Sequence, residues 1–435
     1  MASSKNHLLT EIFLGPDAPN EEDLYKCVHC GFCLEACPTY VETGLETESP
    51  RGRIALMKAV MEKRVPLGPT VSKHWDLCIQ CRACESACPS GVPYGRLIEA
   101  TMAEVERQRK VPLLYRFLTK LLMQRILPHQ RRLSMLALGL RFYQISGLQS
   151  AIRKTGILKL FSKTLADLEL SSPTIPAKTF RARDQIIPAT GEMRSRVALL
   201  SGCVMPLVHG AQMEAVTRVL ARNGCEVIVN SDQACCGAIS SHIGDLDVTR
   251  DLARRNIEAF LSTPVDAIVV ASAGCGSRMK EYGHLLRDDS EYSDKASQLS
   301  GLVKDIHEFL ADLPLVPPSG KLPYRVTYQD SCHLSHAQLI KKAPRELLQS
   351  IPELELIEMP NSDMCCGAGG TYTITQRDFS LRVLNTKMDN VLSTGAEIIA
   401  TANPGCVLQF NLGSQIFGPD IKVRYVIDLL DEAYK

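Results

Sequence analysis

The pattern of apolar and polar positions divides the chain of 435 residues into two kinds of sequence. In much of the first 165 residues, apolar residues recur three and four positions apart, which predicts helices. These predicted helices cover residues 49–60, 97–109, 113–126, 131–145 and 148–165. From residue 193 onward, short strand-like runs alternate with helical stretches, which predicts α/β units built on parallel strands.

The second part of the chain is an internal repeat. In the first copy we expect strands at 197–201, 226–230 and 267–271 and helices at 213–221 and 246–261. In the second copy we expect strands at 325–330, 354–359 and 397–400. The copies close on similar segments, 303–310 and 423–430. Before the repeat, residues 171–192 are rich in Pro, Ser and Thr and are interpreted as an irregular linker.

Composition and charge narrow the functional classes. Charged residues make up 22% and hydrophobic residues 45% of the chain, as in ordinary globular proteins. Residues 1–10 show no apolar signal core, and we find no uncharged stretch of membrane-spanning length. We therefore expect a cytoplasmic protein, or one attached to the inner face of the cell membrane only at its surface.

The net charge of +1 hides a strongly basic segment. Residues 106–165 contain 13 Lys and Arg but a single acid, Glu106, whereas residues 1–105 contain 10 basic and 14 acidic residues. Such segregation indicates a surface for an anionic membrane or an acidic partner, with a solvated helical spacer as the alternative. Nucleic acid is disfavoured as a partner because no base-reading module accompanies the charge.

Two cysteine runs share the spacing C-x2-C-x2-C-x3-C-P, which holds 4Fe–4S clusters in two-cluster ferredoxins. In that arrangement the fourth cysteine of each run binds the cluster of the other run. We expect one cluster on Cys27, Cys30, Cys33 and Cys88, and a second on Cys78, Cys81, Cys84 and Cys37. Zinc usually takes two C-x2-C pairs, and disulfides need an oxidising compartment, so both are weaker interpretations.

Each α/β copy also carries four cysteines that follow its predicted strands. Parallel strands end at one edge of a sheet, where open α/β sheets bind ligands. The two sets are Cys203, Cys235, Cys236 and Cys275, and Cys332, Cys365, Cys366 and Cys406. Either or both sets are candidates for a further iron–sulfur cluster or zinc, with neighbouring glycines letting the backbone approach the metal. Cys225 has no counterpart and is expected to be a buried structural thiol.

Other polar residues near the cysteines receive ordinary roles. Arg51 and Arg53 have the charge to stabilise an anionic cluster, but surface or partner-facing charges are the favoured interpretation. His29, His333 and His336 adjoin cysteines, and packing or hydrogen bonding near a metal ligand is favoured over acid–base chemistry. No catalytic residue is assigned.

The whole chain resembles the iron–sulfur subunits of bacterial glycolate oxidase, a glycolate dehydrogenase. The resemblance rests on two ferredoxin runs followed by two Cys-Cys-Gly (CCG) repeats, with matching stretches at 25–33, 48–54, 330–336, 365–372 and 403–409. Lactate-utilisation iron–sulfur proteins, the iron–sulfur component of anaerobic glycerol-3-phosphate dehydrogenase and heterodisulfide reductase share the layout more loosely. In the last of these a fifth cysteine ends each repeat. Here Arg278 and Gln409 stand at those positions, which weakens a disulfide-reducing function.

The patterns and the resemblance together imply a multidomain protein with α+β and α/β parts. We expect a ferredoxin-type helical domain with two 4Fe–4S clusters at residues 1–105 and a basic helical segment and linker at 106–192. The two α/β cysteine-rich CCG repeats then occupy residues 193–320 and 321–435.

The function implied is electron transfer within an oxidoreductase. We find no GxGxxG motif after a strand and no P-loop, so FAD is expected only on partner subunits. The resemblance implies partners that oxidise glycolate to glyoxylate, while this chain passes electrons to quinone or another membrane acceptor. The alternatives are an iron–sulfur subunit of a D-lactate or glycerol-3-phosphate dehydrogenase, or a thiol/disulfide enzyme acting through the CCG repeats.

Overall fold

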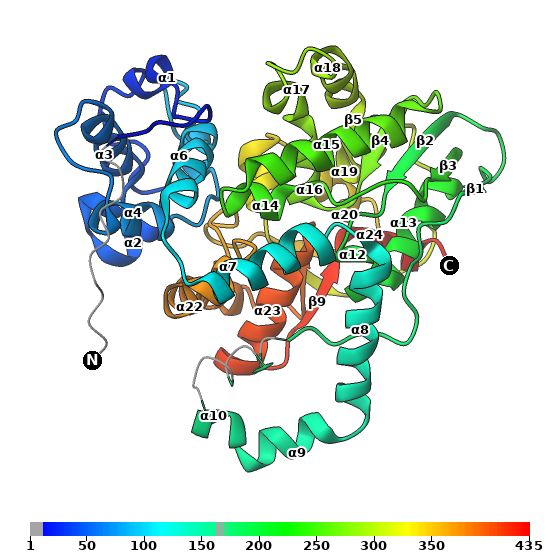
Figure 1. The fold of residues 1–435 in the computed structure, drawn as a ribbon. Helices are drawn as coiled ribbons and strands as arrows, with labels where there is room; N and C mark the ends of the chain where they lie inside the picture. The colour runs from blue at the N-terminus through cyan, green and yellow to red at the C-terminus, as the bar shows by residue number, and fades with distance from the viewer. Residues whose placement is uncertain (1–11, 162–165, 167–168, 171) are drawn as a thin grey trace.

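The computed structural model describes residues 12–161, 166, 169–170 and 172–435 (Figure 1). A small helical domain lies on one side, an α/β body with two sheets forms the centre, and a helical arm extends from the body. The predicted succession of ferredoxin-type helices, helical segment and two parallel-sheet units is confirmed. The expected helix end at residues 162–165 and the N-terminal stretch 1–10 lie outside the described residues.

The N-terminal domain is built from short helices around a compact apolar core. Its elements are α1 (Glu21–Tyr25), α2 (Pro38–Thr43), the 3-10 helix η1 (Glu46–Glu48), α3 (Pro50–Met61), α4 (Pro69–Asp76), α5 (Ala83–Ser86) and α6 (Tyr94–Gln108). Helix α3 begins where expected, because Ser49 accepts a hydrogen bond from the Gly52 amide and Pro50 occupies the first turn. Met57 and Trp75 are fully buried in this core.

The basic segment forms a chain of helices. They are α7 (Leu113–Lys120), the π-helix η2 (Leu121–Ile126), α8 (Gln130–Ile145), α9 (Leu148–Thr155) and α10 (Ile157–Phe161). Gly147 and Gly156 adopt left-handed backbone conformations and so separate α8, α9 and α10. In Figure 1, α7 crosses the front of the α/β body and α9 lies at the far end of the arm.

The α/β body contains two sheets. The first has the order β1-β3-β2-β4-β5, with β1 (Gln185–Ile187), β2 (Ser195–Leu200), β3 (Cys225–Val229), β4 (Ala267–Val270) and β5 (Val303–Asp305). The second has the order β7-β6-β8-β9, with β6 (Arg325–Tyr328), β7 (Glu355–Ile357), β8 (Ile398–Thr401) and β9 (Lys422–Tyr425). All described pairs are parallel except β1–β3, and β1 falls in the segment interpreted as irregular linker.

The helices of the repeats cover these sheets. In the first repeat they are α12 (Met205–Val208), α13 (Gly210–Arg222), α14 (Ala238–His242), α15 (Leu246–Leu261), α16 (Ala273–Lys280), α17 (Tyr282–Leu285), α18 (Ser293–Leu302) and α19 (Ile306–Ala311). In the second they are the π-helix η3 (His333–Ala337), α20 (Ala343–Gln349), α21 (Tyr372–Thr375), α22 (Arg377–Ser393), α23 (Pro404–Phe417) and α24 (Val426–Ala433).

The two repeats share one hydrophobic core and form a single body. Val269 of the first sheet and Val326 of the second belong to the same buried cluster. Across this interface, Arg218 of α13 binds both carboxylate oxygens of Asp431 on α24 at 2.9 and 2.8 Å. Among the helices that the structure describes, we find none with the length and apolar character needed to cross a bilayer.

Candidate functional site

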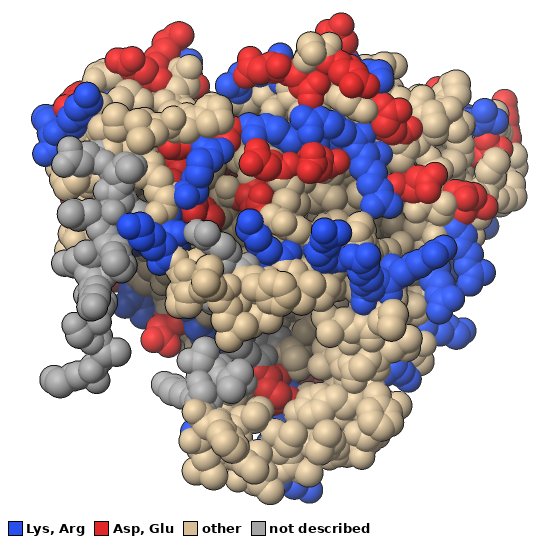
Figure 2. Space-filling model, viewed as in Figure 1, with Lys and Arg blue, Asp and Glu red and all other residues tan. Residues whose placement is uncertain are grey.

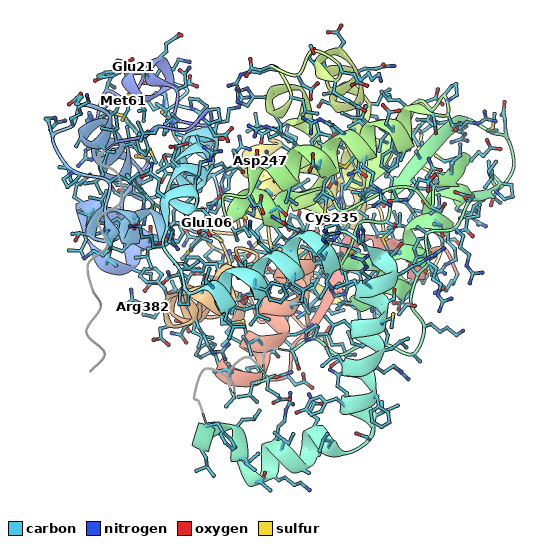
Figure 3. The ribbon with its side chains drawn as sticks, in the orientation of Figure 1. Glu21, Met61, Glu106, Cys235, Asp247 and Arg382 are labelled. Atoms are coloured by element: carbon cyan, nitrogen blue, oxygen red, sulfur yellow. The ribbon has the colours of Figure 1, made fainter. Side chains whose placement is uncertain are left out.

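The eight cysteines of the two repeats line a single cavity of about 380 Å³. They are Cys203, Cys235, Cys236, Cys275, Cys332, Cys365, Cys366 and Cys406. Each set lies just beyond the carboxyl ends of its parallel strands, as the strand pattern predicts. Figure 3 shows Cys235 in the interior, beside the ribbon of α7. The sequence did not indicate that the two sets would share one cavity.

Within each set the sulfur atoms are crowded together. Cys203 and Cys235 lie 3.3 Å apart, and Cys366 and Cys406 lie 3.5 Å apart. Hydrogen bonding to Cys365 raises the pKa of Cys366 to about 12. Four such thiols in a buried place release their protons when a cation takes up the negative charge. This chemistry fits metal ligands, whereas no three described side chains are arranged to hold a single metal ion.

Helix ends and tight turns position these cysteines. Cys275 and Cys406 occupy the first turns of α16 and α23, where the helix dipole favours a thiolate. Gly367 has φ +86°, and a Cβ atom there would lie 2.7 Å from the Ser380 carbonyl oxygen. This CCG glycine is therefore needed to pack the turn against α22, a different reason from the close approach to metal that we expected.

The first ferredoxin-type set lies at the surface of the N-terminal domain. Cys27, Cys30, Cys33 and Cys88 line a common cavity together with Val28 and Phe32. Cys30 is exposed, as are the side chains of Val28 and Phe32. The residues assigned to the first cluster are thus brought together beside solvent, with apolar side chains at their rim.

The second ferredoxin-type set is more deeply placed. Cys37, Cys81 and Cys84 are buried, and burial followed by the nearby charges of Cys81, Cys37 and Cys78 raises the pKa of Cys84 well above its ordinary value. The Tyr94 hydroxyl donates to the Cys78 sulfur at 3.6 Å. The structure therefore gathers the four residues assigned to the second cluster in the protein interior.

A buried arginine lies beside this second set. Arg53 is 1% exposed and donates to Thr39 Oγ1 at 2.9 Å, Glu48 Oε2 at 2.9 Å and the His74 carbonyl oxygen at 2.6 Å. Neighbouring Cys78 and other anionic groups raise its pKa above the ordinary value, although burial alone would lower it. The prediction that this residue is a surface charge was wrong.

Arg51 differs from its neighbour two positions later. Its guanidinium pairs with Glu46 at 2.7 Å and donates to the His29 carbonyl oxygen at 3.0 Å. It therefore ties the first cysteine loop to η1 from a partly exposed position. His29 itself has its pKa lowered by burial and by the positive charges of Lys58 and Arg51.

The second cysteine run contacts the second repeat directly. The Cys365 thiol forms a hydrogen bond with the sulfur of Cys81, which lowers the pKa of Cys81. Ile79, Cys81 and Cys365 belong to one apolar cluster with Tyr372, whose hydroxyl donates to the Leu77 carbonyl oxygen at 3.0 Å. Ligand candidates of two different sites are thus in contact.

The histidines near the cysteines are largely held in hydrogen bonds. His336 contacts Ser86 Oγ through Nδ1 at 2.6 Å and the Asp363 carbonyl oxygen through Nε2 at 2.9 Å. His333 Nε2 lies 3.0 Å from the Gln80 carbonyl oxygen. His242 was not singled out in the sequence, yet its ring lies 5.3 Å from that of His333 and it also lines the cavity.

Two positions explain how the chain differs from a five-cysteine repeat. Arg278 is buried and pairs with Glu99 of α6, so it joins the first repeat to the N-terminal domain. Gln409 is also buried and donates to Ser380 Oγ at 3.0 Å. Both side chains have structural partners in the places where a fifth thiol would stand.

A further buried cation, Lys387, escaped notice in the sequence. Its ammonium group donates to the carbonyl oxygens of Asn361 and Ser362, and burial lowers its pKa to about 8. It lies on the buried face of α22 with Val383 and Leu384. A lysine at that position of an apolar helical stripe is the signal that sequence reading could have used. By contrast, Cys225 is fully buried at the start of β3, as expected.

Family models cover most of the chain. The cysteine-rich domain matches residues 197–280 and 326–411, and the 4Fe-4S dicluster domain matches residues 23–92. The linker region of the glycolate oxidase iron-sulfur subunit matches residues 115–170. The chain is therefore an iron–sulfur protein.

Relatives that span nearly the whole chain agree with these matches. The probable glycolate oxidase iron-sulfur subunit of Bacillus subtilis (strain 168) is 41% identical over 420 residues, which are 95% of each chain. The glycolate oxidase iron-sulfur subunit of Escherichia coli (strain K12) is 34% identical over 416 residues, 94% of each chain. Lactate utilization protein A of Exiguobacterium sp. is 31% identical over 242 residues, 55% of this chain and 98% of its own. The chain belongs to the family of glycolate oxidase iron–sulfur subunits.

Proposed function

We propose that this chain carries electrons within a flavin-dependent 2-hydroxyacid dehydrogenase. The partners are FAD-containing subunits that oxidise glycolate to glyoxylate, and the acceptor is a quinone or another acceptor at the membrane. The observation that supports this proposal is a continuous succession of cysteine sites, from exposed Cys30 through buried Cys81 to Cys365 in the cavity. Iron–sulfur clusters, when bound, exchange one electron at a time, which complements the paired-electron chemistry of a flavin.

The ligand assignment follows the gathered thiols. Cys27, Cys30, Cys33 and Cys88 are assigned to one 4Fe–4S cluster, and Cys37, Cys78, Cys81 and Cys84 to a second. Each set of four cysteines in the cavity is assigned a further iron–sulfur cluster, because four thiolates are the number that one such cluster takes. Zinc in the cavity is the alternative that metal analysis separates.

The charges around the sites suit this role. Arg53 holds a permanent positive charge beside the second set, and Lys387 lies near Cys366. A fixed cation in a low-dielectric interior stabilises an anionic metal centre and thereby tunes its reduction potential. The thiol/disulfide enzyme is disfavoured because Arg278 and Gln409 occupy the positions of the fifth cysteines.

Purification of the complex tests the proposal. The chain is co-expressed with its FAD-containing subunits without oxygen, and dye reduction is measured with glycolate, D-lactate and glycerol 3-phosphate in turn. We expect glycolate to give the highest kcat/KM and a Cys27→Ala/Cys30→Ala variant to lose dye reduction while the flavin is still reduced. Disulfide reduction by the isolated chain, with no response to any hydroxy acid, would contradict the proposal.

Iron and acid-labile sulfide measure the cluster content of the same preparation. Two ferredoxin-type clusters require about eight irons per chain, and filled sites in both repeats require about sixteen. A value near eight, with zinc present, would overturn the assignment of the cavity but leave that of the N-terminal domain intact.

A further inference from the structure

The helices between the N-terminal domain and the first repeat expose many large apolar side chains. On α7 these are Leu113, Leu114, Phe117 and Leu118; on α8 they are Met135, Leu136, Leu138, Phe142 and Ile145; on α9 and α10 they are Leu148, Ile157, Leu160 and Phe161. Leu113 is 82% and Leu160 is 85% exposed. We call these side chains together the linker surface. Exposed apolar area gathered in this way marks an interaction site.

Positive charge accompanies the linker surface. Lys120, Arg125, Arg131, Lys154 and Lys159 lie on the same helices, and within the described chain none of them forms an ion pair with a carboxylate. Figure 2 shows Lys and Arg side chains in a row above a band of uncharged surface that covers α7. A second uncharged region covers the arm around α9. The segment thus combines an apolar face with basic residues whose charges are not neutralised.

We propose that the linker surface docks on the anionic phospholipid surface of a membrane. The proposal deepens the proposed function, on which it rests for the need to reach a membrane acceptor. Amphipathic helices that carry Leu and Phe on one face and Lys and Arg on the other lie in the plane of the lipid interface. The basic side chains would contact lipid phosphates while the apolar side chains enter the upper part of the acyl region.

The composition of the surface favours lipid over a protein partner. Protein interfaces are enriched in Tyr, Trp and Arg and depleted in Lys. The exposed apolar side chains of the linker surface are instead aliphatic or Phe, and several of the free cations are lysines. An acidic protein is therefore the second interpretation, and the experiment below includes it as an outcome.

The position of the linker surface gives docking a functional consequence. Leu122, Met123 and Leu127 follow directly after α7 and line the cavity that holds the eight repeat cysteines. Leu122 is also partly exposed beside Leu118 and Leu121. Docking through α7 would therefore bring the wall of the cysteine cavity next to the membrane, where a lipid-soluble acceptor resides.

Vesicle flotation with the intact, cluster-loaded complex tests the proposal. The probes are vesicles of phosphatidylcholine alone and of phosphatidylcholine mixed with phosphatidylglycerol. We expect binding to the anionic vesicles that weakens with salt, and at least tenfold weaker binding by a Leu114→Glu/Phe117→Glu variant. Leu339→Glu, an equally exposed apolar position in the second repeat, serves as the matched control and should bind like the unmodified complex.

Two outcomes would overturn the proposal. Equal vesicle binding by the α7 variant and the control shows that another surface makes the contact. Loss of the FAD-containing subunits from the α7 variant, with no vesicle binding by the unmodified complex, shows that the surface is a protein interface. Glycolate-dependent reduction of a soluble dye should be unchanged in the α7 variant. Failure of that reaction in the unmodified complex would instead overturn the proposed function.

Discussion

The thiol of Cys365 forms a hydrogen bond with the sulfur of Cys81, although 284 positions separate them in the chain. Cys81 belongs to the second ferredoxin-type run, and Cys365 begins the Cys-Cys-Gly motif of the second repeat. This contact joins the N-terminal domain to the cavity that all eight repeat cysteines line. It is the structural basis for treating the cysteine sites as one succession.

The first prediction concerns the surface cluster. A Cys27→Ala/Cys30→Ala variant should lose about four irons per chain, because it removes two of the four assigned ligands. Cys225→Ala should retain all its iron and lose only roughly 1–3 kcal/mol of stability, since this buried thiol only packs in the core. Iron analysis of the anaerobic proteins measures the difference. Equal iron loss in both variants would refute the ligand assignment.

The second prediction compares two neighbouring arginines. Arg53→Lys should lower the free energy of unfolding by roughly 2–4 kcal/mol, because Lys cannot replace the bonds to Thr39, Glu48 and the His74 carbonyl. Arg51→Lys should cost about 1 kcal/mol or less, since its ion pair with Glu46 is partly exposed.

The single tryptophan offers the readout for this pair. Trp75 is buried in the same domain and donates to the Arg53 carbonyl oxygen at 3.3 Å. Its fluorescence during anaerobic chemical denaturation follows unfolding of the N-terminal domain. Similar transition midpoints for the two variants would show that the buried charge cluster is not a main source of stability.

The third prediction concerns the glycines of the second repeat. Gly367→Ala should destabilise the protein by roughly 2–4 kcal/mol, because φ is +86° and the new methyl group would meet the Ser380 carbonyl oxygen. Gly370→Ala should cost only about 1 kcal/mol, because its φ is +62° but no atom lies within 4 Å of the new Cβ. Thermal unfolding checks this order, and the reverse order would contradict the packing described for the CCG turn.

The fourth prediction is a pH dependence at the interface between the repeats. His209 packs edge-on against Tyr425, and burial lowers its pKa to about 4. Below pH 6.5 the unfolded chain binds a proton that the folded chain does not take up until near pH 4, so stability falls as the pH drops through this window. Between pH 6.5 and 5.5 the loss should be about 1 kcal/mol.

A His209→Phe variant removes this group while keeping an aromatic ring against Tyr425. The difference in unfolding free energy between the unmodified protein and the variant should shift by that amount between the two pH values. A constant difference would mean that His209 titrates alike in the folded and unfolded states.

Much of the fold follows from local sequence patterns. The apolar periodicity placed α15 at its observed bounds, and the runs around Val197 and Ile268 gave the central parallel strands. Strand β1 was missed because it is only three residues long, lies beside prolines and gains its pairing from β3. Its stability comes from a tertiary contact that no local propensity records.

The site shows the same division between local and long-range information. Cysteine spacing alone predicted which residues would gather, because their separations are short and the motif is specific. The shared cavity and the contact of Cys81 with Cys365 depend on how the repeats pack, which no spacing reveals. Arg53 was misjudged because arginine is rarely buried without partners, and its partners Thr39 and Glu48 are recognisable only in the folded domain.

The most direct test of electron transfer through this chain is freeze-quench electron paramagnetic resonance of the anaerobic complex after addition of glycolate. The account predicts that signals of reduced 4Fe–4S clusters appear within one turnover and are lost in the Cys27→Ala/Cys30→Ala variant for the first cluster. Flavin reduction with every cluster of this chain remaining oxidised would contradict it.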